Sequence, residues 1–297
     1  MININIILTI GRRALPTIAS GFKLSNGVTM PCIGLGTWQV PDDDVLVKAI
    51  HSAVNLGYRH IDTAHIYGNE RSVCVAVRTC GVPRSKLFVT SKLWNTDRGY
   101  KETLEAFERT MDALQIGYLD LFLMHWPAAR GEAMTWQSIN SGTWRAMEEI
   151  YRRGRVRAIG VSNFLVHHLV PLLARAEVVP MVNQIEFHPG YMQKATFDFC
   201  RSHGIQVEAW SPLGRGALIH HPVLVELAQQ HGVTTAQIAL RWCLQHGVAA
   251  VPKSLNPERQ KQNAELFSFN LTPEEMERLD NLPQACFSGL DPDHVTF

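Results

Sequence analysis

The stretch Leu119-Asp120-Leu121-Phe122-Leu123-Met124-His125 is a short, almost continuous apolar run that ends in a histidine. A strand with one face in water alternates apolar and polar residues, whereas a strand buried on both faces is apolar along its length. The stretch therefore predicts a strand of a parallel sheet that is covered by other elements on both faces.

Seven further apolar runs of similar length occur along the chain. Together with the first, they cover residues 32–37, 59–62, 87–92, 119–125, 156–162, 181–186, 206–210 and 248–252. Amphipathic helical stretches lie between them, for example at 45–55, 101–114 and 143–153. Eight units of strand and helix in 297 residues predict an α/β fold, a closed (β/α)8 or TIM barrel.

Three features lie outside the eight units. Asn26-Gly27 stands between two short alternating runs and predicts a β-hairpin before the barrel. Two helical stretches, 223–230 and 235–245, lie between the last two strands, so one of them is an extra helix. Thr272-Pro273-Glu274-Glu275 has the cap, proline and glutamate that begin a helix after the eighth unit. Residues 1–19 form an extension of unknown role, and residues 20–297 form a single domain.

The composition is that of an ordinary globular protein. With 46% hydrophobic residues, 19% charged residues and a net charge of +1, it argues against disorder and against a nucleic-acid surface based on bulk charge. Six scattered cysteines predict reduced thiols in a cytoplasmic protein. The apolar run at 6–10 is too short to span a membrane, and Arg12 and Arg13 follow it rather than precede it, so no secretory signal is expected.

Polar residues end the apolar runs. In a (β/α)8 barrel the carboxyl ends of the strands meet at one mouth, where active sites form. Tyr67 lies five residues beyond the second run and joins this set. Each residue alone has an ordinary structural interpretation, but a carboxylate, an ammonium, an imidazole and a phenol on neighbouring strand ends predict a catalytic site. The residues at the run ends are Thr37, Asp62, Lys92, His125, Ser162, Asn163, Gln184, Glu186, Ser211, Lys253 and Ser254.

Four of these groups suit carbonyl reduction. A tyrosine has a pKa near ~10 in isolation, and a buried ammonium beside it favours the phenolate. Asp62 would hold Lys92, Lys92 would tune Tyr67 as a proton donor, and His125 would orient a carbonyl. A nicotinamide must supply the hydride. The pairs His167-His168 and His220-His221 are expected to be exposed and to lack a third ligand, so no metal is predicted.

A series of short motifs follows the strand ends in a fixed order. They are GLGTW (34–38), GYRHIDTA (57–64), YGNE (67–70), TSKLW (90–94), HWP (125–127), IGVSNF (159–164), NQIEFHP (183–189), WSPL (210–213) and PKS (252–254). This ordered set resembles the aldo-keto reductase family from about residue 22 to residue 281, and in particular its microbial diketogluconate and methylglyoxal reductases. The resemblance implies the same barrel, with the hairpin closing its bottom.

The resemblance also implies roles for individual residues. Tyr67 is the general acid, Lys92 and Asp62 tune it, and His125 orients the carbonyl. Trp210 stacks on the nicotinamide of NADPH/NADP+, whose carboxamide meets Ser162, Asn163 and Gln184. Lys253, Ser254 and Arg259 resemble a clamp on the adenosine 2′-phosphate, which favours NADPH over NADH. The full set implied to bind the cofactor is Gly36, Thr37, Trp38, Asp62, Ser162, Asn163, Gln184, Trp210, Ser211, Pro212, Leu213, Lys253, Ser254, Arg259, Gln262 and Asn263.

The loops predict the substrate class. Trp38, Ile66, Trp94 and Trp126 would line an aromatic pocket, and short segments at 214–222 and after Pro283 would leave its mouth open. The expected substrates are small aldehydes and activated ketones, and the expected state is a cytoplasmic monomer.

Two alternatives remain open at this stage. One is a Schiff-base aldolase with Lys92 as its nucleophile. The other is a non-enzymatic barrel that binds NADPH as a sensor or as a partner subunit.

Overall fold

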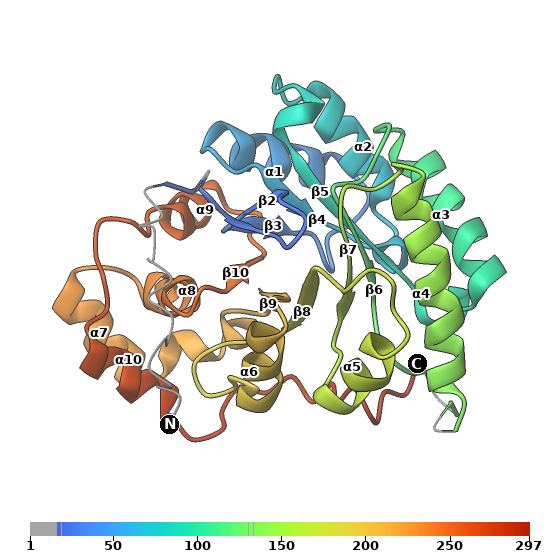
Figure 1. The fold of residues 1–297 in the computed structure, drawn as a ribbon. Helices are drawn as coiled ribbons and strands as arrows, with labels where there is room; N and C mark the ends of the chain where they lie inside the picture. The colour runs from blue at the N-terminus through green and yellow to red at the C-terminus, as the bar shows by residue number, and fades with distance from the viewer. Residues whose placement is uncertain (1–16, 19, 130, 133) are drawn as a thin grey trace, which may run out of the picture.

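The structure, a computed structural model, describes residues 17–18, 20–129, 131–132 and 134–297. Apart from residues 17 and 18, the predicted N-terminal extension lies outside the described residues. Eight parallel strands form the centre of the molecule, at the eight places where the apolar runs predicted them (Figure 1). They are β3 (Gly34–Gly36), β4 (His60–Asp62), β5 (Phe88–Leu93), β6 (Leu121–Met124), β7 (Ile159–Ser162), β8 (Val182–Glu186), β9 (Gln206–Trp210) and β10 (Ala249–Ala250).

The strands pair in chain order, from β3 to β10, and the two edge strands meet. A parallel bridge joins Ile33 to Ala250, and the backbone N–H of Gly36 donates to the carbonyl oxygen of Pro252 at 3.2 Å. A β-carbon at Gly36 would lie 2.8 Å from the carbonyl oxygen of Val251, so glycine is required for this close approach. The predicted barrel closure is therefore confirmed.

Helices surround the barrel (Figure 1). They are α1 (Asp44–Asn55), α2 (Glu70–Thr79), α3 (Tyr100–Leu114), α4 (Trp136–Arg152), α5 (Val166–Leu173), α6 (Lys194–Ser202), α7 (Pro222–His231), α8 (Thr235–Gln245), α9 (Pro257–Ala264) and α10 (Pro273–Asp280).

The helix predictions hold, with one difference at α4. The side chain of Thr272 caps α10 by accepting from the backbone N–H of Glu275, and α7 and α8 both lie between β9 and β10. Helix α4 begins at Trp136, seven residues before the amphipathic pattern at 143. Polar contacts stabilise its first turns, since buried Asn140 donates to the carbonyl oxygen of Pro127 at 2.8 Å. An apolar periodicity cannot report such contacts.

The predicted hairpin closes one end of the barrel. Strands β1 (Gly21–Lys23) and β2 (Thr29–Pro31) are antiparallel and lie outside the eight-stranded sheet. Leu24 and Met30 are buried in one cluster with side chains from inside the barrel, among them Leu121, Leu123 and Ala249. This packing seals the amino-terminal end, so a ligand enters from the opposite mouth.

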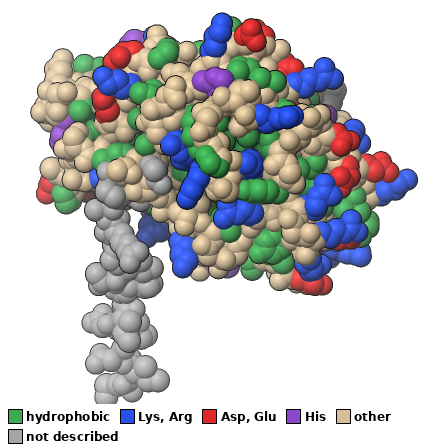
Figure 2. All heavy atoms as spheres, turned by 90° about the horizontal axis from the view of Figure 1, so that it is seen from above, with side chains coloured by type: hydrophobic (Ala, Val, Ile, Leu, Met, Phe, Trp, Pro, Cys, Tyr) green, Lys and Arg blue, Asp and Glu red, His purple; other side chains and the backbone are tan. Residues whose placement is uncertain are grey.

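The surface and the helices agree with the composition. Basic and acidic side chains are both distributed over the face shown in Figure 2, as expected for a net charge of +1. None of the helices that the structure describes combines the length and the apolar composition needed to cross a membrane.

Candidate active site

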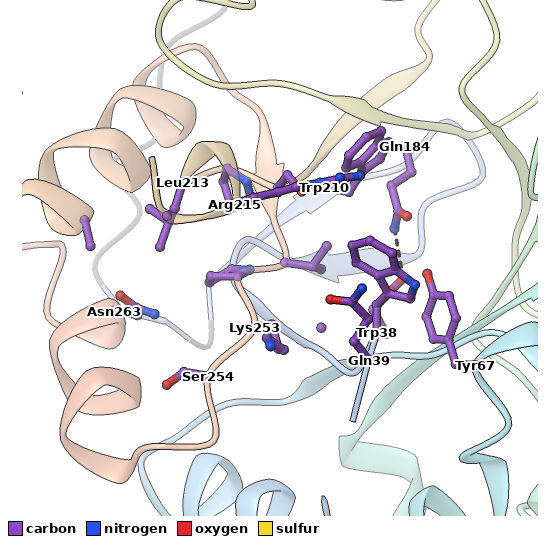
Figure 3. Close-up of a pocket in the computed structure, with 18 of the residues that line it drawn as sticks. Trp38, Gln39, Tyr67, Gln184, Trp210, Leu213, Arg215, Lys253, Ser254 and Asn263 are labelled. Atoms are coloured by element: carbon purple, nitrogen blue, oxygen red, sulfur yellow. Dashed lines mark hydrogen bonds between the residues drawn. The ribbon is translucent and has the colours of Figure 1, made fainter. Parts of the chain in front are cut away.

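A cavity of about 990 Å³ lies at the carboxyl ends of the strands. Its volume is at the upper end of the range for cofactor and ligand sites, so it has room for a large ligand. Tyr67 and Gln184 lie at one end of the view in Figure 3, and Ser254 and Asn263 lie at the other. Apart from Thr37, Lys92 and Glu186, every residue that the sequence placed at the site lines this cavity.

Lys92 links Asp62, which was expected to hold it, to Tyr67, which it was expected to tune. Its ammonium is fully buried at the end of β5 and donates to Asp62 Oδ1 at 2.6 Å, to the carbonyl oxygen of Thr63 at 3.0 Å and to Tyr67 Oη at 3.3 Å. Burial acts to lower the pKa of Lys92, but Asp62 and Tyr67 outweigh it, and the net pKa is raised. The lysine is therefore a fixed cation behind the cavity wall.

Tyr67 stands on a short 3-10 helix (η1, His65–Tyr67) that follows β4. Burial raises the pKa of its phenol, while the ammonium of Lys92 opposes that rise; the net pKa is raised. Lys92 favours the phenolate, as we expected, but its effect on the pKa of Tyr67 is smaller than that of burial. The phenol keeps its proton at neutral pH, as a proton donor must.

His125 faces Tyr67 across the same end of the cavity. Its ring is 5.8 Å from the Tyr67 ring and 5.3 Å from the Trp94 ring, both in edge-on geometry. Burial, together with the charge of Lys92, holds its pKa well below the usual value, so the imidazole is neutral. Its buried Nδ1 has no hydrogen-bond partner among the described residues. A neutral ring on the cavity wall is suited to hydrogen-bonding a ligand.

A second polar group surrounds Asn163. Its Nδ2 donates to the carbonyl oxygen of His125 at 2.9 Å, and its Oδ1 accepts from Trp210 Nε1 at 2.8 Å. Ser162 Oγ donates to the carbonyl oxygen of Gln184 at 2.7 Å. These bonds hold the indole of Trp210 and the ends of β7 and β8 in fixed relative positions beside His125.

The other end of the cavity carries two cations, Lys253 and Arg259. Lys253 and Arg259 both line it and are exposed, and neither forms an ion pair with another described residue. Ser254 lies between them in sequence and accepts from the backbone N–H of Asn256 at 3.2 Å. Two free cations beside a hydroxyl fit an anionic phosphate, and the cavity between them and Tyr67 fits a dinucleotide.

Thr37 does not line the cavity. Its side chain is fully buried outside the cavity wall, and Oγ1 donates to the carbonyl oxygen of Asp62 at 3.0 Å. The structure therefore does not support a cofactor contact by this side chain; Thr37 instead holds the end of β3 against the end of β4.

Several lining residues were not predicted, among them Gln39 and Arg215. The guanidinium of Arg215 lies 5.1 Å from the Trp38 ring, over its face. Both residues have positive φ, 60° and 54°, as do Asn163 and Ser211 in the same cavity. Strained backbone gathers at functional sites. For Arg215, the signal available in the sequence was a cation two residues after the WSPL motif.

The mouth is less open than predicted. Leu290 and Phe297, from the tail after Pro283, line the cavity. The Phe297 ring stacks on Trp94 at 5.2 Å and meets Trp126 edge-on at 5.4 Å. The prediction of a tail too short to cover the mouth was wrong, because the tail runs back across the barrel instead of leaving it.

The histidine pair on α5 differs from the prediction as well. His168 is buried, and Asp293 of the tail is the third group: its Oδ1 lies 2.8 Å from His167 Nε2 and 3.1 Å from His168 Nε2. Leu165 donates its backbone N–H to His168 Nδ1, so Nε2 carries the proton that faces Asp293. A metal would have to displace that proton, and the absence of a metal site stays a prediction.

Comparisons with known proteins agree with this geometry. A sequence model of the aldo/keto reductase family matches residues 32–283. The chain is similar to glyoxal reductase of Bacillus subtilis (strain 168), with 47% identity over 93% of this chain and 97% of that protein. It is 40% identical to methylglyoxal reductase DkgA of Salmonella typhimurium, over 94% and 98% of the two chains. A structure of a Gox0644 variant in complex with NADPH matches with a TM-score of 0.86 and 38% identity, over 93% and 98%.

Proposed function

The chain belongs to the aldo/keto reductase family and is an oxidoreductase, and on that premise we propose that it reduces aldehydes and activated ketones to alcohols with NADPH. The observation that carries the proposal is the ammonium of Lys92, which bonds Asp62 on one side and Tyr67 on the other. When Tyr67 gives its proton to a carbonyl oxygen, the tyrosinate that forms lies beside the fixed cation of Lys92. A nearby positive charge of this kind stabilises the conjugate base of a proton donor.

Each group has one task in the proposed reaction. Bound NADPH supplies a hydride to the carbonyl carbon. Tyr67 Oη gives its proton to the carbonyl oxygen as negative charge develops there, and Lys92 stabilises the tyrosinate left behind. The neutral ring of His125 donates a hydrogen bond to the same oxygen and fixes its direction. Asp62 keeps the ammonium charged and in place.

The cavity wall supports binding of the whole dinucleotide. Trp210 is held by Asn163 and presents a flat ring for stacking on the nicotinamide. Lys253 and Arg259, with Ser254, would bind the 2′-phosphate, which NADH lacks. Beyond them Gln262 and Asn263 line the end where the adenine would lie.

Small carbonyl compounds fit the remaining space best. Trp38, Ile66, Trp94 and Trp126 line the cavity near Tyr67, and Phe297 completes an aromatic wall. Relatives named for glyoxal and methylglyoxal support the same class. We expect a higher kcat/KM for methylglyoxal, short keto esters and electron-poor aromatic aldehydes than for steroids, measured as NADPH oxidation over one panel.

Tyr67→Phe tests the mechanism. Loss of the proton donor should lower kcat about 10²–10⁴-fold, while the Kd of NADPH, followed by its fluorescence, changes little because the phenol is not proposed to hold the cofactor. A Phe variant that kept most of its activity would show that another group gives the proton.

The two alternatives have less support. Lys92 is fully buried, bonded to three acceptors and absent from the cavity wall, which is unfavourable for attack on a substrate carbonyl. Borohydride trapping of a substrate adduct on Lys92 would support the aldolase. A pure NADPH-binding protein would oxidise no NADPH with any carbonyl of the panel.

We also propose that the protein is a cytoplasmic monomer. The six cysteines are free, as reduced thiols would be. Size-exclusion chromatography with light scattering should give a mass near 33.3 kDa, and twice that mass would contradict the monomer.

A further inference from the structure

We propose that Glu208 is a positioning residue of the reductase site and acts on it through the side-chain amide of Gln184. The inference rests on the proposed function. Glu208 lies on β9 inside the barrel, is fully buried and does not line the cavity. Neither the proton transfer proposed for Tyr67 nor the cofactor contacts described above use it.

Gln184 connects Glu208 to the catalytic groups. Its Nε2 donates one hydrogen to Asp62 Oδ2 at 2.8 Å and the other to Glu208 Oε2 at 2.7 Å. The other oxygen of Asp62 accepts from Lys92. A continuous line of hydrogen bonds therefore runs from Glu208 through Gln184 and Asp62 to Lys92, and from there to Tyr67.

The two acceptors fix the amide in one orientation. If Asp62 were the only acceptor, either N–H of Gln184 could bond it, and the amide plane could take two orientations. With Glu208 as the second acceptor, both hydrogens are used and only Oε1 remains for a ligand. Gln184 lines the cavity, so this oxygen is the group left to accept from the carboxamide of a bound nicotinamide.

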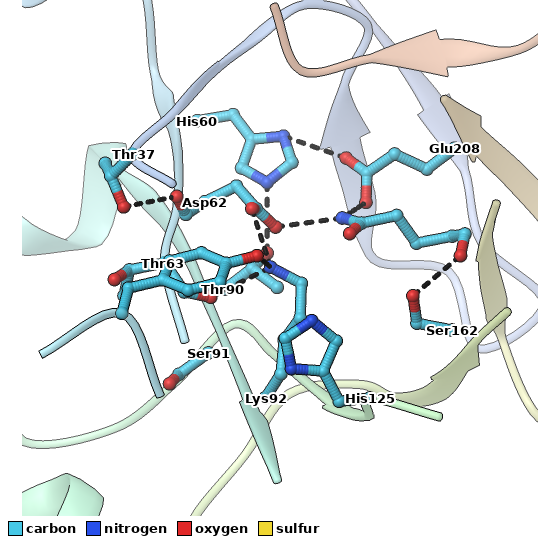
Figure 4. A network of polar contacts seen from close by, with 12 residues as sticks. Thr37, His60, Asp62, Thr63, Thr90, Ser91, Lys92, His125, Ser162 and Glu208 are labelled. Atoms are coloured by element: carbon cyan, nitrogen blue, oxygen red, sulfur yellow. Dashed lines mark hydrogen bonds and ion pairs between the residues drawn. The ribbon is translucent and has the colours of Figure 1, made fainter. Parts of the chain in front are cut away.

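His60 faces Oε1 of Glu208, the carboxyl oxygen that does not bond Gln184. Its Nδ1 is 3.5 Å from Glu208 Oε1 (Figure 4), and both atoms are buried without a hydrogen-bond partner among the described residues. His60 Nε2 lies 3.0 Å from Thr90 Oγ1. If Nε2–H donates to Thr90, Nδ1 is an acceptor, and only a protonated Glu208 has a hydrogen to give it.

The charges around Glu208 favour that protonated form. Burial raises its pKa to about 8, and the nearby carboxylate of Asp62 adds to the rise. Burial lowers the pKa of His60 to about 4, so the imidazole does not supply a compensating charge. The other charged group that faces this interior, the ammonium of Lys92, is already paired with Asp62. At neutral pH Glu208 is a neutral hydrogen-bonding group, and above pH 8 it becomes a second anion near Asp62.

Two substitutions separate the hydrogen bonds from the charge. In Glu208→Gln, the amide oxygen accepts from Gln184 and the amide nitrogen donates to His60, which reproduces the protonated carboxyl at every pH. In Glu208→Leu, the size is kept but Gln184 loses an acceptor. An unsatisfied buried N–H corresponds to about a 5- to 150-fold loss, which we expect in kcat/KM with NADPH. Glu148→Gln is the matched control, because Glu148 is a buried carboxylate on α4 outside the cavity wall.

The pH profile is the readout that a purely structural residue would not change. In the wild type, ionised Glu208 adds negative charge near Lys92 and weakens the acid Tyr67, so kcat/KM for reduction should fall with an apparent pKa near 8. Glu208→Gln should match the wild type at pH 7 and should lack this step. The same step in both proteins, or wild-type kcat/KM in Glu208→Leu, would overturn the proposal.

A measurement without cofactor or substrate tests the proton on Glu208. A carboxyl whose pKa is raised by folding contributes stability at low pH and loses it as the pH rises from about 4.5 to about 8. The Tm of the wild type should therefore fall relative to that of Glu208→Gln across this window, and the difference should be constant above it. A Tm difference between the wild type and Glu208→Gln that stayed constant at every pH would overturn the assignment of a proton to Glu208. A wild type that reduces no carbonyl would instead refute the proposed function, whatever the melting curves show.

Discussion

Phe297→Ala removes the ring that the C-terminal tail lays over the cavity. This ring is 40% exposed, stacks on Trp94 at 5.2 Å and meets Trp126 at 5.4 Å. Each aromatic pair contributes about 0.5–1.5 kcal/mol, so the two contacts together hold the tail with about 1–3 kcal/mol. That sum is small enough for a single substitution to release the end of the tail.

The expected consequence is a change in substrate binding rather than in chemistry. A small aromatic aldehyde loses one stacking wall, which corresponds to about 0.5–1.5 kcal/mol and to about a 2- to 13-fold rise in KM. The kcat should stay within about twofold, because Tyr67 and Lys92 keep their contacts, and bulky carbonyl compounds should gain activity as the mouth widens.

Steady-state NADPH oxidation with a small and a bulky aldehyde measures both effects. Phe287→Ala is the matched control: Phe287 is another tail aromatic, stacked on Tyr191 at 4.6 Å, and it does not line the cavity. Equal KM values in the Phe297→Ala variant and the wild type for both aldehydes would refute the inference that the tail forms part of the substrate wall.

Two further predictions concern the cofactor and the stability. Arg259→Ala should weaken the binding of NADPH by about 1.5–3 kcal/mol, because a charge-assisted bond is lost, and should leave the binding of NADH unchanged. Kd values from cofactor fluorescence measure both effects. Equal weakening of the binding of both cofactors would assign Arg259 a structural role instead. Burial and the neighbouring His167 lower the pKa of His168 to about 4, so its contribution to stability is present above pH 6.5 and is lost as the pH falls toward 4. The Tm of the wild type should therefore fall more steeply in this window than that of His168→Gln, and parallel curves would contradict the assignment.

The sequence by itself determined the barrel and indicated where the groups that we propose for catalysis lie. Each strand is a short apolar run, and such a run indicates a buried strand whichever distant segments cover it. In a parallel barrel every strand also ends at the same mouth. The polar residue after each run, such as Asp62, Lys92 or His125, could therefore be assigned to one site before any contact was known.

Only the tertiary structure decided how these groups are bonded and charged. The net rise in the pKa of Tyr67 depends on burial outweighing a cation, and sequence spacing gives neither quantity. Thr37 ends an apolar run as Asp62 does, but it turns away from the cavity to bond the neighbouring strand. The bond of Gln184 to Glu208 joins two strands inside the barrel, where a polar residue in an apolar run gives no indication of its partner.

The C-terminal tail shows the same limit at long range. Asp293 meets His167 of α5 across 126 positions, and Phe297 reaches Trp94 from the far end of the chain. No periodicity covers such a segment, and its length alone did not indicate its direction. Contacts of this kind depend on the path of the whole chain around the barrel. The sequence therefore indicated the residues of the proposed site, while the tertiary structure decided which residues form the wall beside them.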